Sequence, residues 1–492
     1  MTNRPNNFFW PASLLWLGLV WNVLMVPPLL MAQKPDGDSA AGEEVVPLDE
    51  QPGEAKPDEA AQPDFDKMSA RQFFELIDFG ESYLAMLVDG EELGISEQEA
   101  IIRGLTRIRR LQPHRITHWL ELQTPWQELA EHPAQHRLEI FLLTGKVEAV
   151  RRQMVPEEAV STVAMASYYE VDVRLDQESG TAPGTIVVEN IPAAWQANLD
   201  QPEALQGQPI SCPGIFLKTF QAEGGETGYV FATSKLSWHP DQVNPRLDVT
   251  PAKVRLAKQG MDIGELAFIQ DRAKLEGRER EPFYQMLATV SRLPKDQQTA
   301  TIAKSVSELL TLPKNGLMVA PEAYRAEFID LAGVCRRITR IEIDDEDIEK
   351  RLGIDHYYEV SIFVPIPTPI VSQRPGDEAS RKEFAHEYPV LVCVPTLPKG
   401  IHEGDELHLS VAATGAFFKL WAHRTLFMSG QEHTRRQISP LFVASELRKH
   451  TVESDPQVNQ FVLAMLLILS LVIGIGVAMG MIFSRKPSSR RR

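Results

Sequence analysis

The residues most suited to ligand contact are aromatic and cationic, and they occur twice in the same order. The sequence Tyr-Tyr-Glu-Val begins at Tyr168 and again at Tyr357, and a Gly-x-Phe-x-Lys pattern ends at Lys218 and again at Lys419. Aromatic rings can stack on a planar or chain-like ligand. The alternative interpretation is a set of core aromatics beside a structural Lys–Glu pair, because one face of each strand must be buried. The predicted ligand groove consists of Tyr168, Tyr169, Phe216, Lys218, Tyr357, Tyr358, Phe417, Lys419 and Trp421.

No catalytic motif accompanies these residues. Nucleophile elbows, P-loops, dinucleotide fingerprints, HExxH and CxxCH motifs are absent from the sequence. Cys212, Cys335 and Cys393 lie in apolar contexts and are predicted to be buried thiols, with a Cys335–Cys393 disulfide as the open alternative. Histidine pairs at four-residue spacing in the first half have no counterparts in the second. We therefore predict that the protein is not an enzyme and holds no metal and no cofactor.

Composition limits the class of protein. The chain has 492 residues, of which 43% are hydrophobic and 24% charged, as in ordinary globular domains. Three cysteines exclude a disulfide scaffold. The formal net charge of −17 argues against phosphate-backbone binding as the main role, so we predict no nucleic-acid partner.

The chain repeats itself. Five blocks recur in the same order, and the distance between matching blocks grows only where the second half has extra polar residues, which predicts surface loops at 372–387 and 428–437. We infer two copies of one unit, near 67–248 and 249–455. The matching blocks are 97–111 with 279–293, 133–145 with 321–333, 168–171 with 357–360, 214–218 with 415–419, and 231–236 with 442–447.

Each copy begins with amphipathic helices and continues with strands. Apolar residues recur every three or four positions in 73–87 and 101–111, whereas they alternate in 168–175 and 357–364. Each copy gives about five strands, the first containing a glycine (Gly145, Gly333), with an irregular or helical connection before the Gly-x-Phe-x-Lys strand. This order resembles the OB-fold, a five-stranded Greek-key barrel. The layout also resembles an uncharacterised family of membrane-anchored bacterial proteins, a resemblance that implies no activity.

The apolar segments predict a topology. Residues 461–483 contain no charge and are long enough to span a bilayer, and a basic tail follows them, which places the C-terminus in the cytoplasm. Residues 1–32 have the form of a signal peptide or signal-anchor. Residues 33–66 are acidic and rich in proline and glycine, which predicts a disordered linker. Gly476 and Gly480 could form a dimer seam inside the span.

The predicted fold class is α+β, with two helical-plus-barrel units and one C-terminal transmembrane helix. The predicted location is the cytoplasmic membrane, with a single pass and an extracytoplasmic ectodomain. The leading functional hypothesis is a non-enzymatic binding or scaffold protein of the cell envelope, with the membrane and an envelope protein as partners and a homodimer as an open alternative. Two further hypotheses are an OB-fold nucleic-acid-binding protein and an unrecognised envelope enzyme. The predicted domains are 1–32, 33–66, 67–132 (helical), 133–248 (barrel), 249–320 (helical), 321–455 (barrel), 461–483 and 484–492.

Overall fold

The computed structural model describes residues 68–109, 111, 116, 118–120, 124–177, 180–374, 377–425, 436–450, 465 and 470. The predicted signal segment, acidic linker and basic tail lie outside these residues. So does the predicted span 461–483 with its Gly476–Gly480 seam, apart from Met465 and Ser470. Within the described part of the chain, no helix has both the length and the apolar character needed to cross a membrane.

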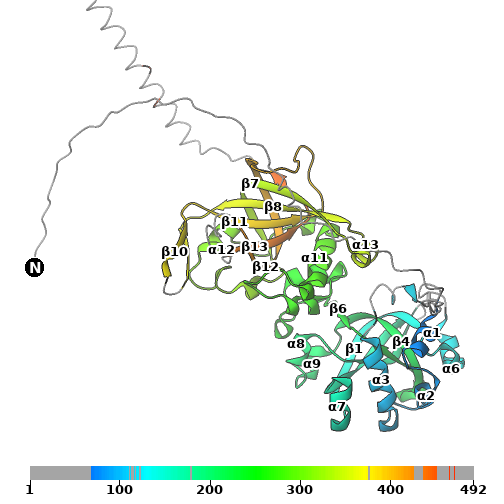
Figure 1. The fold of residues 1–492 in the computed structure, drawn as a ribbon. Coiled ribbons are helices and arrows are strands. Elements are labelled where there is room, and N and C mark those ends of the chain that lie inside the picture. The colour runs from blue at the N-terminus through cyan, green and yellow to red at the C-terminus, as the bar shows by residue number, and fades with distance from the viewer. Residues whose placement is uncertain are drawn as a thin grey trace, which may run out of the picture. The chain divides into compact units, whose positions relative to one another are not determined.

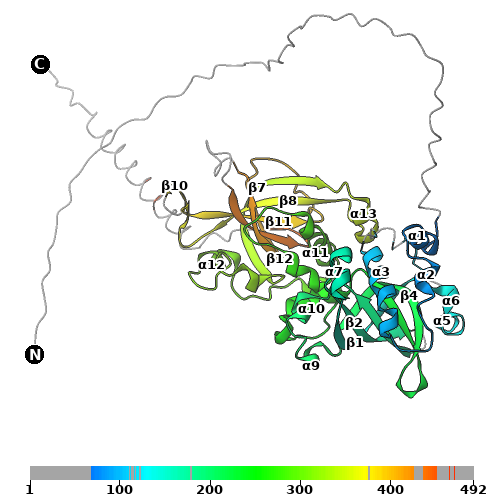
Figure 2. The ribbon, with the colours of Figure 1, turned by 60° about the horizontal axis from the view of Figure 1, so that its bottom comes forward.

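Short helices open the described chain. Helix α1 starts after Ser69, whose hydroxyl accepts the N–H of Gln72 while the Gln72 side chain accepts the N–H of Ser69, a reciprocal capping box. Helix α3 buries Ile101, Leu105 and Ile108 on one face and lies beside the strands of the first barrel (Figure 2). The helices before the first barrel are α1 (Ala70–Leu76), α2 (Glu81–Leu84), α3 (Gln98–Ile108), α5 (Trp126–Glu131) and α6 (Pro133–His136).

The first barrel is a closed antiparallel sheet with one parallel pair. The strand order is β1-β2-β3-β5-β4-β6, and β4 also pairs with β1, which closes the ring. Strands β3 and β5 run parallel. Helix α7 (Glu157–Val163) connects β1 to β2, and α8 (Ala193–Gln196) and α9 (Pro202–Leu205) connect β3 to β4. The strands are β1 (Ile140–Met154), β2 (Ser167–Gln177), β3 (Gly180–Val188), β4 (Pro209–Gln221), β5 (Thr227–Thr233) and β6 (Ser237–Trp238).

A second helical segment follows the first barrel. The 3-10 turn η5 starts after Asp262, whose carboxylate accepts the N–H of Gly264. Helix α11 buries Phe283, Met286, Leu287 and Val290, whose three- and four-residue spacing puts them on one face of the helix. The elements are η4 (Pro245–Leu247), α10 (Pro251–Lys258), η5 (Ile263–Phe268), η6 (Gly277–Glu279), α11 (Arg280–Arg292), η7 (Lys295–Gln297), α12 (Val306–Thr311) and η8 (Pro321–Tyr324).

The second barrel has the same topology as the first. The order is β13-β11-β8-β7-β12-β14, β12 also pairs with β13, and β11 runs parallel to β13. Helix α13 (Glu346–Leu352) connects β7 to β8. The stretch predicted as a surface loop at 372–387 instead contributes to a separate hairpin of β9 and β10 (Figure 1). The strands are β7 (Phe328–Glu342), β8 (His356–Pro365), β9 (Ile370–Arg374), β10 (Asp377–Phe384), β11 (Glu387–Val394), β12 (Leu409–His423), β13 (Gln437–Ala444) and β14 (Arg448–Lys449).

The two barrels bend at matching places. The pairing of β1 with β2 shifts register between Val147 and Ala149, and that of β7 with β8 shifts between Cys335 and Arg337. A β-bulge of this kind increases the local coil that a small barrel needs. Glycine is required nearby: at Gly145 a side chain would collide with the backbone oxygen of Arg174 on the paired strand.

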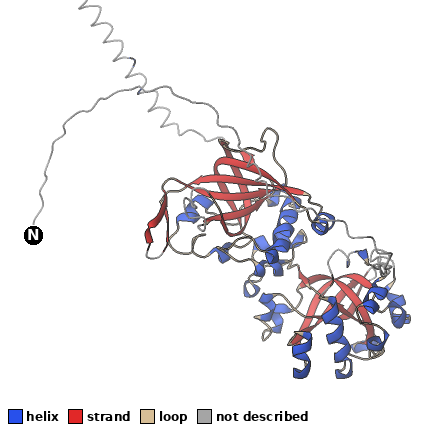
Figure 3. Cartoon of the chain, viewed as in Figure 1, coloured by secondary structure: helices blue, strands red, loops and turns tan. Residues whose placement is uncertain are grey.

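Three hydrophobic clusters form the core of the described residues, and Figure 3 shows the helices beside the strands of each barrel. One fills the second barrel. Another packs α1 to α3 on the outside of the first barrel. The third joins the interior of the first barrel to α10, α11 and the outside of the second. Helices therefore cover part of each barrel's outer surface, so several strands are buried on both faces.

Candidate functional site

Most residues of the predicted groove lie in the core. Phe216, Lys218, Phe417 and Lys419 each have 0% exposed surface. A ligand cannot reach these side chains while the barrels stay folded. Tyr168 and Tyr169 are also buried, whereas Tyr357, Tyr358 and Trp421 are half-buried and the Trp421 ring stacks on His423 with centroids 4.8 Å apart. The nine residues therefore do not form one exposed groove.

The two lysines attach helices to strands. Lys218 Nζ lies 2.6 Å from Glu97 Oε1, and Glu97 also accepts the N–H groups of Val88 and Gly94. Because both charged groups are buried with hydrogen-bond partners, this is a structural ion pair. The alternative interpretation of the sequence was thus closer, although the glutamate comes from the turn before α3 rather than from the Tyr-Tyr-Glu-Val strand.

The same pair occurs in the second half. Lys419 Nζ lies 2.6 Å from Glu279 Oε1, and Glu279 accepts the N–H groups of Gln270 and Glu276. Burial lowers the pKa of Lys419, and the Glu279 carboxylate opposes that shift. Glu97 and Glu279 are identical residues of the first matching block, so the repeat itself held the signal that identifies the partners.

An open cavity on the second barrel offers accessible apolar surface. Its volume is about 890 Å³. Val360 and Ile362 of β8 point into the barrel, so Ser361 and Phe363 face outward, and both line the cavity. Pro389 of β11 lies beside them. The cavity therefore lies on the outer face of the second and third barrel strands.

Arg336 forms one wall of this cavity. Its guanidinium carbon lies 4.3 Å from the centroid of the Phe363 ring, a cation–π contact. One of its terminal nitrogens pairs with Glu387. Its Nε is buried and makes no hydrogen bond within the described structure. The cavity thus combines an aromatic ring with a stacked arginine.

The first barrel has a smaller, charged cavity of about 560 Å³ on the corresponding face. Arg174 pairs with Glu148 at 3.2 Å and with Glu226 at 3.0 Å. Arg151 pairs with Glu170 and Asp172. These cross-strand ion pairs satisfy one another, so the face has few free groups for a ligand.

Side chains at equivalent positions account for the contrast. Aligning Tyr168 with Tyr357 places Arg174 opposite Phe363 and Asp172 opposite Ser361. Aligning the first strands places Glu148 opposite Arg336. The outer face of the second barrel therefore has Phe363 with Arg336 and Arg337 beside it, whereas the same face of the first barrel has a group of cross-strand ion pairs. Both differences can be read from the aligned sequences, at positions where the two halves are not identical.

The titratable groups do not indicate a reactive centre in the part of the chain that is described. Burial raises the pKa of Cys212 to about 12 and that of Cys335 to about 11, so both remain thiols at neutral pH. The three cysteines are free and buried, so Cys335 and Cys393 are not bonded. Burial lowers the pKa of His423, beside the cavity, to about 4. No group of histidine, cysteine and carboxylate side chains among the described residues could hold a metal ion.

No known protein family and no curated protein matches the chain. Solved structures that resemble it include a single-stranded DNA binding protein from Thermus aquaticus, with 10% identity, coverage of 64% of this chain and 94% of that one, and a TM-score of 0.14. Fission yeast Pot1 with ssDNA has 11% identity, coverage of 64% and 84%, and a TM-score of 0.16. The Ifi202 HINa domain with double-stranded DNA has 8% identity, coverage of 63% and 93%, and a TM-score of 0.11.

One prediction is corrected at this point. The exclusion of nucleic acid as a partner is not upheld: DNA-binding proteins are among the solved structures reported above, and net charge does not decide whether a protein binds nucleic acid. The exclusion rested on net charge, which sums the whole chain, including eleven acidic residues between Asp36 and Asp66. Binding depends on the charges that line a groove. What the described residues support is an OB-like barrel, and the envelope scaffold hypothesis has no support from them.

Proposed function

We propose that this chain is a non-enzymatic binding protein whose second barrel holds its ligand on the outer face of β8 and β11. We propose single-stranded nucleic acid as the ligand class. Nucleic-acid binding was one of the alternative hypotheses from the sequence. The observation that carries the proposal is the cavity of about 890 Å³ in which Arg336 stacks on Phe363. Arginine planes and aromatic rings stack on bases of any sequence.

The position of the cavity supports the same proposal. In OB-folds, the face of the second and third strands is where oligonucleotides and oligosaccharides bind. Strands β8 and β11 are the second and third strands of the second barrel. The first barrel has ion pairs on that face, so we assign it no ligand.

The experiment measures binding of a fluorescein-labelled oligo(dT) to the purified full chain by anisotropy at several salt concentrations. Phe363→Ala should weaken binding roughly 5- to 150-fold, because a stacked base contributes about 1–3 kcal/mol. Arg336→Gln should weaken binding and flatten the salt dependence, since one cation fewer contacts the backbone. The matched control is Arg174→Gln, the position equivalent to Phe363 in the first barrel, which should bind like the wild type.

Absence of oligo(dT) binding by the wild-type chain would overturn the nucleic-acid proposal. Binding that Phe363→Ala leaves unchanged would place the site elsewhere. A sulfated oligosaccharide serves as a second probe, because it separates affinity for any polyanion from affinity that needs bases.

We also propose that residues 67–248 and 249–455 are two copies of one unit. The support is the shared strand order, the bulge at matching positions in β1 and β7, and the equivalent Lys218–Glu97 and Lys419–Glu279 pairs. On this proposal one copy has the ion-pair face and the other has the cavity.

A further inference from the structure

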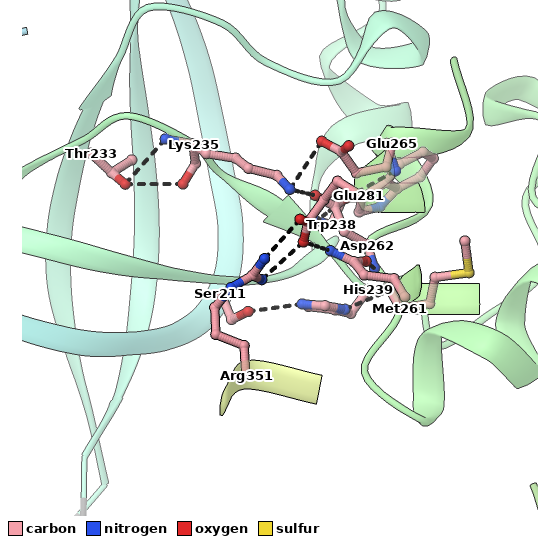
Figure 4. Close-up of polar contacts among 12 residues, drawn as sticks. Ser211, Thr233, Lys235, Trp238, His239, Met261, Asp262, Glu265, Glu281 and Arg351 are labelled. Atoms are coloured by element: carbon pink, nitrogen blue, oxygen red, sulfur yellow. Dashed lines mark hydrogen bonds and ion pairs between the residues drawn. The ribbon is translucent and has the colours of Figure 1, made fainter. Parts of the chain in front are cut away.

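An ion-pair cluster ties the segment that leaves the first barrel to the start of the second half (Figure 4). Lys235 follows β5, and its Nζ lies 2.9 Å from Glu265 Oε1 and 3.4 Å from Asp262 Oδ2. Asp262 caps η5 and Glu265 lies within it. The side chains of Asp262 and Glu265 are only 3% and 11% exposed, whereas that of Lys235 is 38% exposed, so the lysine reaches two buried carboxylates from the rim of the junction.

Backbone groups extend the same junction. Asp262 Oδ1 accepts the N–H of Trp238 at 3.0 Å. His239 Nδ1 lies 3.0 Å from the carbonyl oxygen of Met261, and its Nε2 lies 2.8 Å from Ser211 Oγ. Because a carbonyl can only accept, Nδ1 donates to Met261, and in the neutral imidazole Nε2 then accepts from the serine hydroxyl. The residues after β5 are therefore hydrogen-bonded both to β4 of the first barrel and to the segment that begins η5.

The network continues to the second barrel. The N–H of Asp262 donates to Gln285 Oε1 at 3.0 Å, and Gln285 Nε2 donates to Glu281 Oε1 at 2.8 Å. Arg351 of α13 then donates to both oxygens of Glu281, at 2.9 and 2.8 Å. Helix α13 connects two strands of the second barrel. A continuous series of polar contacts thus joins one barrel to the other.

Apolar packing accompanies these polar contacts. Trp195 and Trp238, both buried, meet edge to face with ring centroids 5.8 Å apart. Trp238, Ile263 and Phe283 belong to one hydrophobic cluster. The junction is therefore packed as a protein interior is, and not as a linker between independent domains.

Comparison of the two halves identifies the residue that is particular to the junction. The block Phe-Ala-Thr-Ser-Lys-Leu ends the first barrel, and Phe-Val-Ala-Ser-Glu-Leu ends the second. Lys235 therefore corresponds to Glu446. The lysine is present in the first half, whose end contacts Asp262 and Glu265 of the η5 turn, and it is replaced by glutamate in the second half.

We propose that Lys235 is a positioning residue that fixes the first barrel to the helices of the second half, so that the two barrels move as one unit. On this inference the first barrel orients the second, rather than offering an independent site on a flexible tether. The inference does not depend on which ligand the second barrel binds.

Electrostatics favour this role. Burial acts to lower the pKa of Lys235, but the carboxylates of Asp262, Glu265 and Glu281 outweigh it, so the pKa is raised and the side chain stays charged. Lys235→Glu would place a further carboxylate among three, and like charges this close repel strongly.

The first test is hydrogen exchange of the full chain followed by mass spectrometry. In Lys235→Glu, peptides covering 236–264 should exchange about tenfold faster or more, because the junction opens locally. Peptides covering 357–364 in the second barrel should be unchanged. The matched control is Glu446→Lys, the reverse exchange at the equivalent position, which should leave 236–264 protected.

The second test is the distance distribution between a spin label on the first barrel and one in the segment that directly precedes the second barrel. Cysteines introduced at the exposed positions Leu142 and Val319 can be labelled selectively, since the native cysteines are buried. The wild-type chain should give one narrow distribution and Lys235→Glu a broad one. The double variant Lys235→Glu with Glu265→Lys reverses the pair and should restore the narrow distribution.

Two results would overturn the inference. One is a broad distribution in the wild-type chain, which means that the barrels move independently. The other is wild-type protection of 236–264 in Lys235→Glu. Should Lys235→Glu fail to fold, Lys235→Gln removes the cation without adding a charge and should still speed exchange in 236–264.

Discussion

A buried lysine that meets a buried glutamate is costly unless both are well hydrogen-bonded. Lys218 with Glu97 and Lys419 with Glu279 meet that condition, because each glutamate also accepts two backbone N–H groups. The pair therefore fixes where the helical segment joins the barrel. Sequence reasoning found the two lysines but left open whether they line a ligand groove or form a structural Lys–Glu pair, since residue type alone does not reveal whether a strand residue faces the core.

Removing one partner should be far more damaging than removing both. Glu279→Gln leaves the Lys419 ammonium buried without its counter-charge, so we expect a loss of about 3–5 kcal/mol in the free energy of unfolding. Glu97→Gln should cost a similar amount if the halves are copies of one unit. Urea denaturation measures both, with Glu223→Gln at an exposed position as control.

A double variant separates the cost of an unpaired charge from the value of the pair itself. Lys419→Met combined with Glu279→Gln removes both charges and keeps a side-chain oxygen that can accept a backbone N–H, so it should recover part of the stability that Glu279→Gln alone loses. The same urea denaturation experiment measures it. A small effect of Glu279→Gln alone would contradict this account.

At the scale of elements, the alternation of apolar and polar residues predicted where the barrel strands lie, but it did not predict which strand faces are buried. The pattern of β2 and β8 gave the period of two that the structure has. Helices cover part of each barrel from outside, however, so that Tyr168 and Leu391 are buried although they face away from the barrel interior. Alternation cannot separate an inner face from a covered outer face. The hairpin of β9 and β10 was missed because its polar residues favour a loop.

The first strand of each barrel contains a glycine at a point where the paired strand leaves no room for a side chain. At Gly333 a β-carbon would collide with the backbone oxygen of Phe363, and a strand backbone cannot yield as a flexible side chain can. Gly333→Ala should therefore destabilise the chain by about 1–3 kcal/mol, the usual cost of overpacking. Gly277→Ala, where the space is open, is the control in the same thermal unfolding experiment. Equal melting temperatures for the two variants would contradict this account, because they would show that the backbone near Phe363 can shift to admit a β-carbon.

At the scale of the whole molecule, location decides which ligand the second barrel can meet. The described residues leave the predicted topology untested, so it rests on the sequence. Residues 461–483 carry no charge, and the positive charges gather directly after them, at Arg485, Lys486 and Arg490 to Arg492. Cytoplasmic flanks collect such residues. This predicts that both barrels lie outside the cytoplasm, where nucleic acid is met only as an extracellular polymer.

Protease accessibility in intact spheroplasts tests that topology. With an epitope tag placed after Arg492, added protease should remove the barrels and leave a short tagged fragment that spans the membrane. Detergent should make the tag accessible as well, which controls for intact membranes. If the full-length protein resists protease until detergent is added, the predicted orientation is wrong, because both barrels are then cytoplasmic. That result would bring the chain into contact with intracellular nucleic acid and would strengthen the proposed ligand class, whereas the predicted result favours oligosaccharide as the next probe for the same cavity.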